Sequence, residues 1–434
     1  MASIRPFAGV RYSRNKGFDF SDVIAPPYDV LDEAGKAELQ RRDPHNIVTV
    51  DWPYPKQKVA GPDEVYTGAD ITLRSWVAAG VVEKDKRPAF YPYSQSYEHH
   101  GRMFHRRGFI ALVKLSAFGE GDVVPHEKTY AGAIEDRMKL MRATGMQLSP
   151  IFGLFSDGKN EVTGMLYSGL GRPEVSANLQ GVRHDLWSVG DAETESKVID
   201  WMKGRPVYIA DGHHRYTTAL QYKKEMEAAN GGPLPPAHPA NWCMFVLVGM
   251  QDPGLLILPT HRLIGGIGSF DVAAFSKALG DSAEVTSAAI GGEPAAMAEH
   301  LVNTLPAHSF GLYDGRHKTL YTVRLKNLDV LKNLEPGQSD AWRHLDVAIL
   351  QRYLLDEVIA PRFAAGKEVA KGYTAHAREV PAMVDGERYQ IGLLLRSTPL
   401  HALEELGKTG EVMPQKSTYF YPKLATGLVM NPLK

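Results

Sequence analysis

The chain has 434 residues, which is long enough for about two or three domains and a large buried core. Its 49 lysines and arginines balance 50 aspartates and glutamates, so no overall positive field is available to hold nucleic acid by its phosphates. The single cysteine excludes an internal disulfide, and the chain contains neither a signal-peptide-like N-terminus nor an apolar run of membrane-spanning length, so we expect a soluble, cytoplasmic protein.

The first half of the chain alternates predicted strands and helices. Residues 4–12 predict a short strand at a sheet edge, because proline and glycine interrupt the segment. Residues 63–79 predict an amphipathic helix that Gly80 ends. The other predicted elements are strands at 89–97 and 106–115, a helix at 132–143, a buried strand at 149–155, two strands within 161–190 and a helix at 193–202.

A double proline precedes the first candidate site residue, Asp29. Pro26 and Pro27 fix an extended backbone and remove two amide donors, so Tyr28 and Asp29 are held in one presentation. Two interpretations of Asp29 stay open. It is either a functional carboxylate or the cap of a helix that begins near residues 32–33.

A second polar cluster, Pro125-His126-Glu127-Lys128-Thr129, lies before the predicted helix at 132–143. His126 and Glu127 are adjacent, so on a regular element their side chains diverge and a two-ligand clip for one metal ion is awkward. A hydrogen-bonding or acid/base role suits them better. The alternative is a polar loop in which Thr129 caps the helix.

The segment that organises the chain is Val207 to Leu220, which predicts a strand, a tight turn and a helix from about 213 to 229. The turn carries Asp211-Gly212-His213-His214-Arg215. Glycine allows the main chain to approach a ligand closely, and the start of a helix attracts anions. Two histidines and an arginine at this end of the helix therefore indicate a phosphate-binding site. The alternative is a structural turn in which the histidines cap the helix and the arginine pairs with a carboxylate.

The second half continues the alternation of strands and helices. After a proline-rich loop at 231–236, strands are predicted at 243–249 and 255–259. Residues 270–325 predict a small α/β insert. Residues 344–355 predict a core helix, and residues 392–396 predict a central strand.

Polar groups gather again in the C-terminal segment 413–423. Lys416-Ser417-Thr418 lacks the upstream glycines of a P-loop, so that motif is rejected. A strand here would place Lys416 and Thr418 on one face and Tyr419 on the other. We expect one polar face to contribute Lys416, Thr418 or Tyr419 to phosphate or nucleotide binding. Packing against the core is the alternative for this segment.

The Asp211 to Arg215 pentapeptide resembles the phosphate-binding box of the ParB/sulfiredoxin superfamily, in particular its free-serine kinase members. The chain from end to end resembles the DUF1015 family of bacterial proteins. The segments that carry this resemblance are Arg5-Pro6-Phe7, Ile24 to Val30, Pro125-His126-Glu127, Asp211 to Tyr216 and Met413 to Lys423.

The resemblance implies a mixed α/β (α+β) fold with a ParB/sulfiredoxin-like core in residues 1–268. A long insertion at about 85–200 interrupts this core, which departs from the compact relatives. A small α/β insert would follow at 269–335, and residues 336–434 would pack back on the core.

The resemblance also implies a nucleotide-dependent, kinase-like phosphotransferase that acts on a small hydroxyl-bearing metabolite such as serine or phosphoserine. The pentapeptide would hold the phosphates of ATP or ADP. Asp29 or Glu127 would act as the base, His126 and His213 would transfer protons, and Asp211 with Glu127 would bind Mg²⁺. A phosphorylated small molecule is the expected ligand, with no membrane partner, and a homodimer is compatible with the sequence.

Three competing functions stay open at this point. A phosphomonoester hydrolase would use the same phosphate-binding site with water as the acceptor. A non-enzymatic nucleotide-binding switch would need contacts between subunits that close on the ligand. DNA binding is the weakest, because the charge is balanced and no basic recognition helix is present.

Overall fold

The computed structural model describes residues 3–56, 59–127, 131–268, 270–288, 292–384 and 388–434. The chain forms two compact units. The first unit contains Met1–Pro125, Thr129–Leu255 and Pro422–Lys434, and the second contains His126–Lys128 and Leu256–Tyr421. The predicted domain boundaries after residues 268 and 335 both fall inside the second unit.

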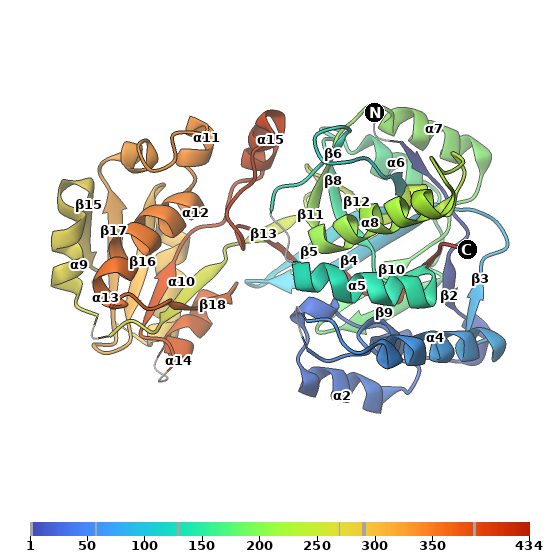
Figure 1. Cartoon of the computed structure of the whole chain (residues 1–434), viewed down its shortest axis with the longest axis horizontal. Helices are drawn as coiled ribbons and strands as arrows, with labels where there is room; N and C mark the ends of the chain where they lie inside the picture. The colour runs from blue at the N-terminus through green and yellow to red at the C-terminus, as the bar shows by residue number, and fades with distance from the viewer. Residues whose placement is uncertain (1–2, 57–58, 128–130, 269, 289–291, 385–387) are drawn as a thin grey trace. The chain divides into compact units, whose positions relative to one another are not determined.

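A mixed sheet, nine-stranded among the described residues, forms the centre of the first unit (Figure 1). β12 pairs in parallel with β8 and antiparallel with β5, and β11 pairs antiparallel with β8. This sheet confirms the predicted mixed α/β class. In order across the sheet the strands are β6 (Val123–Val124), β11 (Val207–Asp211), β8 (Ile151–Phe155), β12 (Trp242–Gly249), β5 (Arg102–Lys114), β4 (Tyr91–His99), β10 (Val182–Leu186) and β9 (Val175–Leu179), with β1 (Ile4–Arg5) paired to β5.

The predicted insertion at about 85–200 is therefore part of this sheet. It supplies β5 and β8, which both pair with β12, and β4, which pairs with β5; β8 also pairs with β11. All eight residues of β12 are buried, because helices and strands cover both of its faces. Such a continuous apolar strand has to lie in the centre of the sheet.

Helices surround the sheet of the first unit, and α5 packs against both α4 and α8 (Figure 1). A separate apolar cluster around Trp52, Tyr66 and Trp76 joins the N-terminal helices. The helices of this unit are α1 (Phe20–Val23), α2 (Glu33–Arg42), α3 (Val48–Asp51), α4 (Asp63–Ala78), α5 (Ala131–Thr144), α6 (Glu161–Tyr167), α7 (Ala192–Met202) and α8 (His213–Ala229).

The two strands predicted within residues 161–190 are present, but a helix that was not predicted precedes them. Residues 161–190 contain helix α6 before strands β9 and β10. The Asp157 side chain accepts hydrogen bonds from the amides of Glu161 and Val162 at 2.9 and 3.0 Å, which caps the start of the helix. Val162 and Leu166, four residues apart, then bury one face of that helix.

The second unit is built on a sheet that has six strands among the described residues. β15 to β17, which come from the predicted insert at 270–325, lie in the same sheet as β14, β18 and β19. In order the strands are β15 (Ala283–Ser287), β17 (Thr319–Leu325), β16 (Ser309–Asp314), β19 (Ile391–Leu394), β14 (His261–Gly265) and β18 (Ala370–Thr374). β19 is central, as predicted.

Helices of several kinds cover the sheet of the second unit. The core helix predicted at 344–355 is present, but its main part is a π-helix, η6 (Ile349–Ile359), that follows α12 (Asp346–Ala348). Leu350, Leu354 and Leu355 of that helix are buried. The remaining helices are α9 (Val272–Leu279), α10 (Pro294–Thr304), α11 (Asp340–Arg343), α13 (Ala360–Phe363), α14 (Val380–Val384) and α15 (Leu400–Thr409).

Short strand pairs complete each unit. Within the second unit, β13 (Leu256–Leu258) pairs with β20 (Tyr419–Tyr421). Within the first unit, β2 (Val10–Tyr12) pairs with β3 (Val82–Lys84), and β7 (Met146–Gln147) pairs with β21 (Asn431–Pro432). Single helical turns are η1 (Arg14–Lys16), η2 (Tyr28–Val30), η3 (Pro239–Asn241), η4 (Gly280–Ser282), η5 (Leu328–Leu331) and η7 (Ala377–Glu379).

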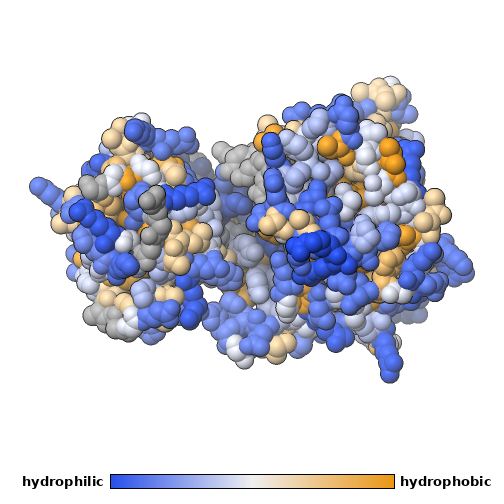
Figure 2. All heavy atoms as spheres, turned by 90° about the horizontal axis from the view of Figure 1, so that it is seen from below, coloured by the Kyte–Doolittle hydropathy of each residue, from blue (hydrophilic) through white to orange (hydrophobic). Residues whose placement is uncertain are grey.

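The surface is mixed in character. On the face that Figure 2 shows, the described residues are mostly hydrophilic, and hydrophobic residues are scattered between them. Exposed large apolar side chains include Ile71 and Val77 of α4 and Met103 of β5. In the part of the chain that the structure describes, no helix has the length and apolar character needed to cross a membrane.

Candidate functional site

The segment at 207–229 has the predicted strand, turn and helix. β11 ends at Asp211, Gly212 adopts the left-handed conformation with φ of 96°, and α8 begins at His213. The residue at the cap position, Gly212, has no side chain with which to cap the helix. The turn is therefore at the positive end of a helix of 17 residues, where the helix dipole favours an anion.

Two cations flank the Asp211 carboxylate in this turn. Lys423 Nζ donates to Asp211 Oδ2 at 2.8 Å, and an Arg215 guanidinium nitrogen lies 4.0 Å from Asp211 Oδ1. Burial alone would raise the pKa of Asp211, but the charges of Lys423, Arg215 and His213 together hold the pKa of that carboxyl well below its usual range. Asp211 is thus a carboxylate at neutral pH.

Arg215 is held by the protein on both sides. Its guanidinium donates to the Pro150 carbonyl and forms the longer ion pair with Asp211. It also lies over the turn, since a Cβ built on Gly212 would be 3.0 Å from three guanidinium atoms. The alternative in which Arg215 pairs with a carboxylate is therefore partly correct. That carboxylate belongs to Asp211, in the same pentapeptide.

The two histidines of the pentapeptide differ in burial. His213 is buried and its charge contributes to lowering the pKa of Asp211. His214 is half-buried. The charged groups of the pentapeptide thus lie in one turn, as expected. Its role as a phosphate-binding site stays a prediction.

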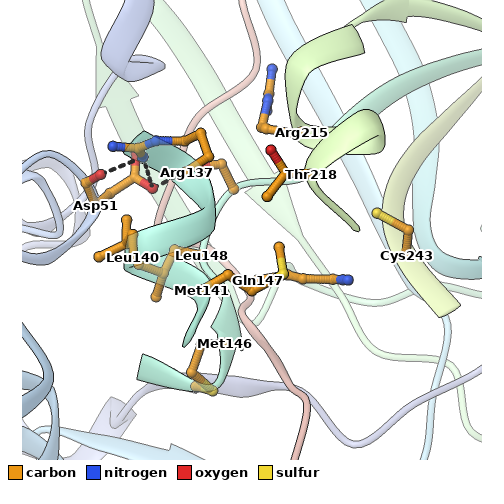
Figure 3. Close-up of a pocket in the computed structure, with 11 residues that line it drawn as sticks. Asp51, Arg137, Leu140, Met141, Met146, Gln147, Leu148, Arg215, Thr218 and Cys243 are labelled. Carbon is orange, nitrogen blue, oxygen red and sulfur yellow. Dashed lines mark hydrogen bonds and ion pairs between the residues drawn. The ribbon is translucent and has the colours of Figure 1, made fainter. Parts of the chain in front are cut away.

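A small cavity of about 40 Å³ lies beside Arg215 in the first unit (Figure 3). Arg137 of α5 and Asp51 meet at one side of it, and Thr218 of α8 lies on the other (Figure 3). The remaining lining residues are Leu140, Met141, Met146, Gln147, Leu148, Ser149 and Cys243. At roughly 10–15 Å³ per water, such a space holds a few waters or a small ligand group.

A buried ionic network fixes the Arg137 side of the cavity. The Arg137 guanidinium lies 2.6 Å from Asp136 Oδ2 and 3.4 Å from Asp51 Oδ1. Burial would lower the pKa of Arg137, but these two carboxylates raise it further above its usual value. Ser149 Oγ donates to Asp51 at 2.8 Å, and Tyr66 donates to Asp136 at 2.6 Å. Arg137 is therefore charged, and the two carboxylates of Asp136 and Asp51 compensate its charge.

Thr218 presents a buried hydroxyl to the same cavity. Its residue is 0% exposed, and Oγ1 has no hydrogen-bond partner among the residues that the structure describes. A buried hydroxyl without a partner costs about 1–3 kcal/mol. A ligand or a water in the cavity would remove this cost. Cys243, across the cavity, is buried, and burial raises the pKa of its thiol to about 12.

Asp29 lies in the helical turn η2 and is exposed. The capping alternative for Asp29 is wrong, because the cap of α2 is Asp32, whose Oδ1 accepts a hydrogen bond from the Gly35 amide at 2.7 Å. The residue before Asp29 has a specific contact. The Cζ atom of Arg137 lies over the Tyr28 ring, 4.1 Å from the ring centre, in a cation–π contact. The segment that the two prolines fix therefore contacts the ionic network.

The other predicted site residues belong to the second unit. His126 is buried, and its Nε2 lies 3.1 Å from Thr418 Oγ1, so these two predicted residues are in contact. Glu127 is half-buried. Thr129, the alternative cap, lies outside the described residues. The assignment of His126, Glu127 and Thr418 to a phosphate site stays a prediction.

The predicted strand through Lys416 is shorter than expected. β20 covers only Tyr419–Tyr421, and Lys416 is an exposed residue in a turn, with φ of 59°. The turn is fixed by Ser417, which donates to the Pro414 carbonyl. Lys416 and Thr418 therefore do not share a strand face, and the assignment of Lys416 and Tyr419 to phosphate binding stays a prediction.

Magnesium does not fit the predicted ligands. Asp211 Oδ2 accepts a hydrogen bond from Lys423 Nζ, and Asp211 Oδ1 lies 4.0 Å from the Arg215 guanidinium. Across the described ranges, no group of three or more His, Cys, Asp or Glu residues could hold a metal ion. The carboxylate of Asp211 serves to pair cations.

Sequence reasoning missed three residues of this site. Lys423 is in the C-terminal motif, 212 residues after its partner, and only its place in that motif marks it. Arg137 follows Asp136 in a predicted helix, which gives no sign of their burial. Thr218 has the appearance of an ordinary helical residue.

Comparisons with known proteins give a family and a set of distant structures. A family model described as a protein of unknown function, DUF1015, matches residues 4–348, which confirms the family resemblance. No curated protein matches the chain in sequence.

Solved structures that resemble the chain have low identities and TM-scores. A conserved hypothetical protein from Pyrococcus furiosus is 16% identical with a TM-score of 0.33, over 71% of this chain and 92% of that one. A free serine kinase variant in complex with AMP is 12% identical with a TM-score of 0.35, over 71% and 89%. SbnI with a C-terminal truncation from Staphylococcus aureus is 10% identical with a TM-score of 0.36, over 75% and 87%.

Proposed function

We propose that this chain, which belongs to the DUF1015 family, is a nucleotide-dependent phosphotransferase that acts on a small hydroxyl-bearing metabolite such as serine. One observation carries the proposal. Arg215 and Lys423 flank a single carboxylate at the positive end of α8. Two cations and one carboxylate leave one positive charge, and the helix dipole adds to it, which suits a phosphate group.

The two arginines near the cavity have different proposed roles. Arg137 is paired with Asp136 and Asp51, so its charge is already compensated, and it contacts the Tyr28 ring. Arg215 shares one carboxylate with Lys423. We therefore assign phosphate binding to Arg215 and Lys423, and a structural role to Arg137.

The proposed chemistry uses positioning and charge. Transfer of a phosphoryl group needs its oxygens held and its developing charge neutralised, while a base accepts the proton of the attacking hydroxyl. Gly212 lets the backbone approach the phosphate, and Arg215 and Lys423 neutralise its charge. Thr218 offers its hydroxyl to the ligand. Asp29, exposed and next to Tyr28, is the proposed base.

Phosphorus-31 NMR on the full chain tests the proposal. The protein is incubated with magnesium salt, serine or phosphoserine, and ATP, ADP or CTP. A phosphotransferase gives a phosphoserine signal that grows with the signal of the spent nucleotide, which is the nucleoside diphosphate from ATP or CTP and the monophosphate from ADP. Release of inorganic phosphate from phosphoserine without nucleotide would instead identify a hydrolase, and nucleotide binding without turnover would identify a switch.

Matched variants tie the result to the site. Arg215→Gln removes one of the two cations and is expected to abolish turnover. Arg172→Gln changes an exposed arginine of the same unit and serves as the control. Turnover that survives in Arg215→Gln at the rate of the control would reject this site, whatever the reaction.

A further inference from the structure

The second unit contains a larger cavity, of about 260 Å³, that none of the predicted site residues lines. Three segments far apart in the sequence meet around it. They are the residues before β16, the residues of α11 and α12 with their junction, and the segment that follows β19 together with α15. The polar lining residues are His308, His344, Asp346, Arg396, Ser397, Thr398, His401 and Glu405.

His308 is fixed at this cavity by one carboxylate. Its backbone amide and its Nδ1 both lie within hydrogen-bond range of Asp346 Oδ1, at 3.2 and 3.0 Å. The residue adopts a left-handed φ of 55°, which side-chain-bearing residues rarely do. Backbone strain of this kind is kept where the surroundings enforce it, and it concentrates at functional sites. With Nδ1 engaged, the other ring nitrogen is the one that can bind a ligand.

Arg396 has unused hydrogen-bonding capacity at the same cavity. One guanidinium nitrogen forms an ion pair with Asp346 Oδ2 at 3.6 Å. Its Nε is buried and has no hydrogen-bond partner among the described residues. A guanidinium offers five donors in a fixed fork that matches phosphate and carboxylate geometry.

The N-terminus of α15 adds a third attraction for anions. This helix has 10 residues, its preceding residue is Pro399, and no side chain of a described residue caps it. His401 and Ala402 of its first turn line the cavity. The segment before the helix is anchored, because the buried Thr398 hydroxyl donates to the Ser417 carbonyl at 2.8 Å. The helix therefore presents its positive end to a fixed cavity.

We propose that this cavity is a second ligand site, which binds a small phosphate monoester through Arg396, His308, His401 and the first turn of α15. The proposal is independent of the function assigned to the first unit. A guanidinium, imidazoles and a helix N-terminus from separate segments converge on one cavity, and this donor set is suited to phosphate oxygens. Asp346, which pairs with Arg396, and Glu405 also line the cavity, and both carboxylates oppose an anion.

Isothermal titration with phosphoserine and with inorganic phosphate tests this site, using the full chain that carries Arg215→Gln, so that phosphate binding by the first unit, which keeps Lys423, is reduced. In that background, Arg396→Gln is expected to weaken binding about tenfold or more, because one charge-assisted contact is lost. Glu405→Gln is expected to strengthen binding a few-fold, because a repulsive charge is removed. Arg324→Gln changes an exposed arginine of the same unit and should leave binding unchanged.

A second variant and two further ligands complete the experiment. If Arg396→Gln lowers the melting temperature, the exposed His401→Gln carries the same test. Serine and acetate, which lack the phosphate, should bind at least tenfold more weakly than phosphoserine, and equal binding of acetate would identify a carboxylate site instead. Absence of binding in the Arg215→Gln background, or equal affinity in the Arg396, His401 and Arg324 variants, would overturn the proposal.

Discussion

Lys423→Met is the substitution for which the structure gives the clearest magnitude. Lys423 Nζ lies 2.8 Å from Asp211 Oδ2, and the two side chains are 17% and 20% exposed. Removal of one partner from a buried ion pair costs roughly 3–5 kcal/mol, because the other charge stays buried without compensation. Asp211 keeps Arg215 at 4.0 Å. We therefore expect a loss near the lower end, about 3 kcal/mol, in the free energy of unfolding.

A double-mutant cycle isolates the pair. Lys423→Met, Asp211→Asn and the double variant are unfolded in urea, with circular dichroism and fluorescence recorded together so that the transitions of the two units are separated. The double variant should lose less than the two single losses added together, by about 1–3 kcal/mol. Lys203→Met, at an exposed lysine, is the control. A coupling below about 0.5 kcal/mol, the range in which independent sites add, would refute the importance of the pair.

The same pair predicts a pH dependence. Since the folded-state pKa of Asp211 is depressed, its contribution to stability is complete above the unfolded pKa of about 3.9 and is lost as the pH falls through the folded value. The stability difference between wild type and Asp211→Asn should therefore be constant from neutral pH to about 5 and shrink below about 4. A difference that persists unchanged into strong acid would contradict the depressed pKa.

Three further substitutions test the proposed site. Gly212→Ala places a Cβ at φ of 96° and 3.0 Å from the Arg215 guanidinium, so we expect a loss of about 1–2 kcal/mol in stability by urea unfolding and a displaced arginine that weakens nucleotide binding. Thr218→Val removes a buried hydroxyl that has no partner among the described residues, so melting temperature should stay or rise while titration shows weaker nucleotide binding; a drop in melting temperature with binding unchanged would contradict this. Asp29→Asn should lower kcat by about 10²–10⁴ with nucleotide affinity unchanged, and if Glu127→Gln shows that signature instead, the base is Glu127.

Most secondary structure could be predicted from local pattern, and the errors have physical causes. The helix α4 and the strands β4 and β5 lie where periodicity placed them. Helix α6 was missed because its start is capped by Asp157, four residues before Glu161, and not by a residue directly before the helix. The sheet order could not be predicted, because β12 lies between β5 and β8, and both strands are far from it in the sequence.

The candidate site could likewise be predicted only where its residues are close together in the sequence. The turn at Gly212 and the charges beside it could be found in sequence, since one pentapeptide contains them. The partners that decide its electrostatics come from elsewhere. Lys423 reaches Asp211 across 212 residues, and the Pro150 carbonyl binds Arg215 across 65. Such pairings depend on the topology of the sheet, which local periodicity does not determine.

The positive charges around this turn are partly compensated by a carboxylate within the turn itself. Two histidines and an arginine at a helix start would repel the dipole, and Asp211, four residues before Arg215, offsets part of that repulsion. Lys423 then adds a further cation to the same carboxylate. A purely structural turn would need only one cation for Asp211, because each further buried charge must be desolvated as well. The surplus positive charge supports the proposed binding of an anionic ligand, and removing either cation should weaken the binding of that proposed ligand more at low salt than at high salt.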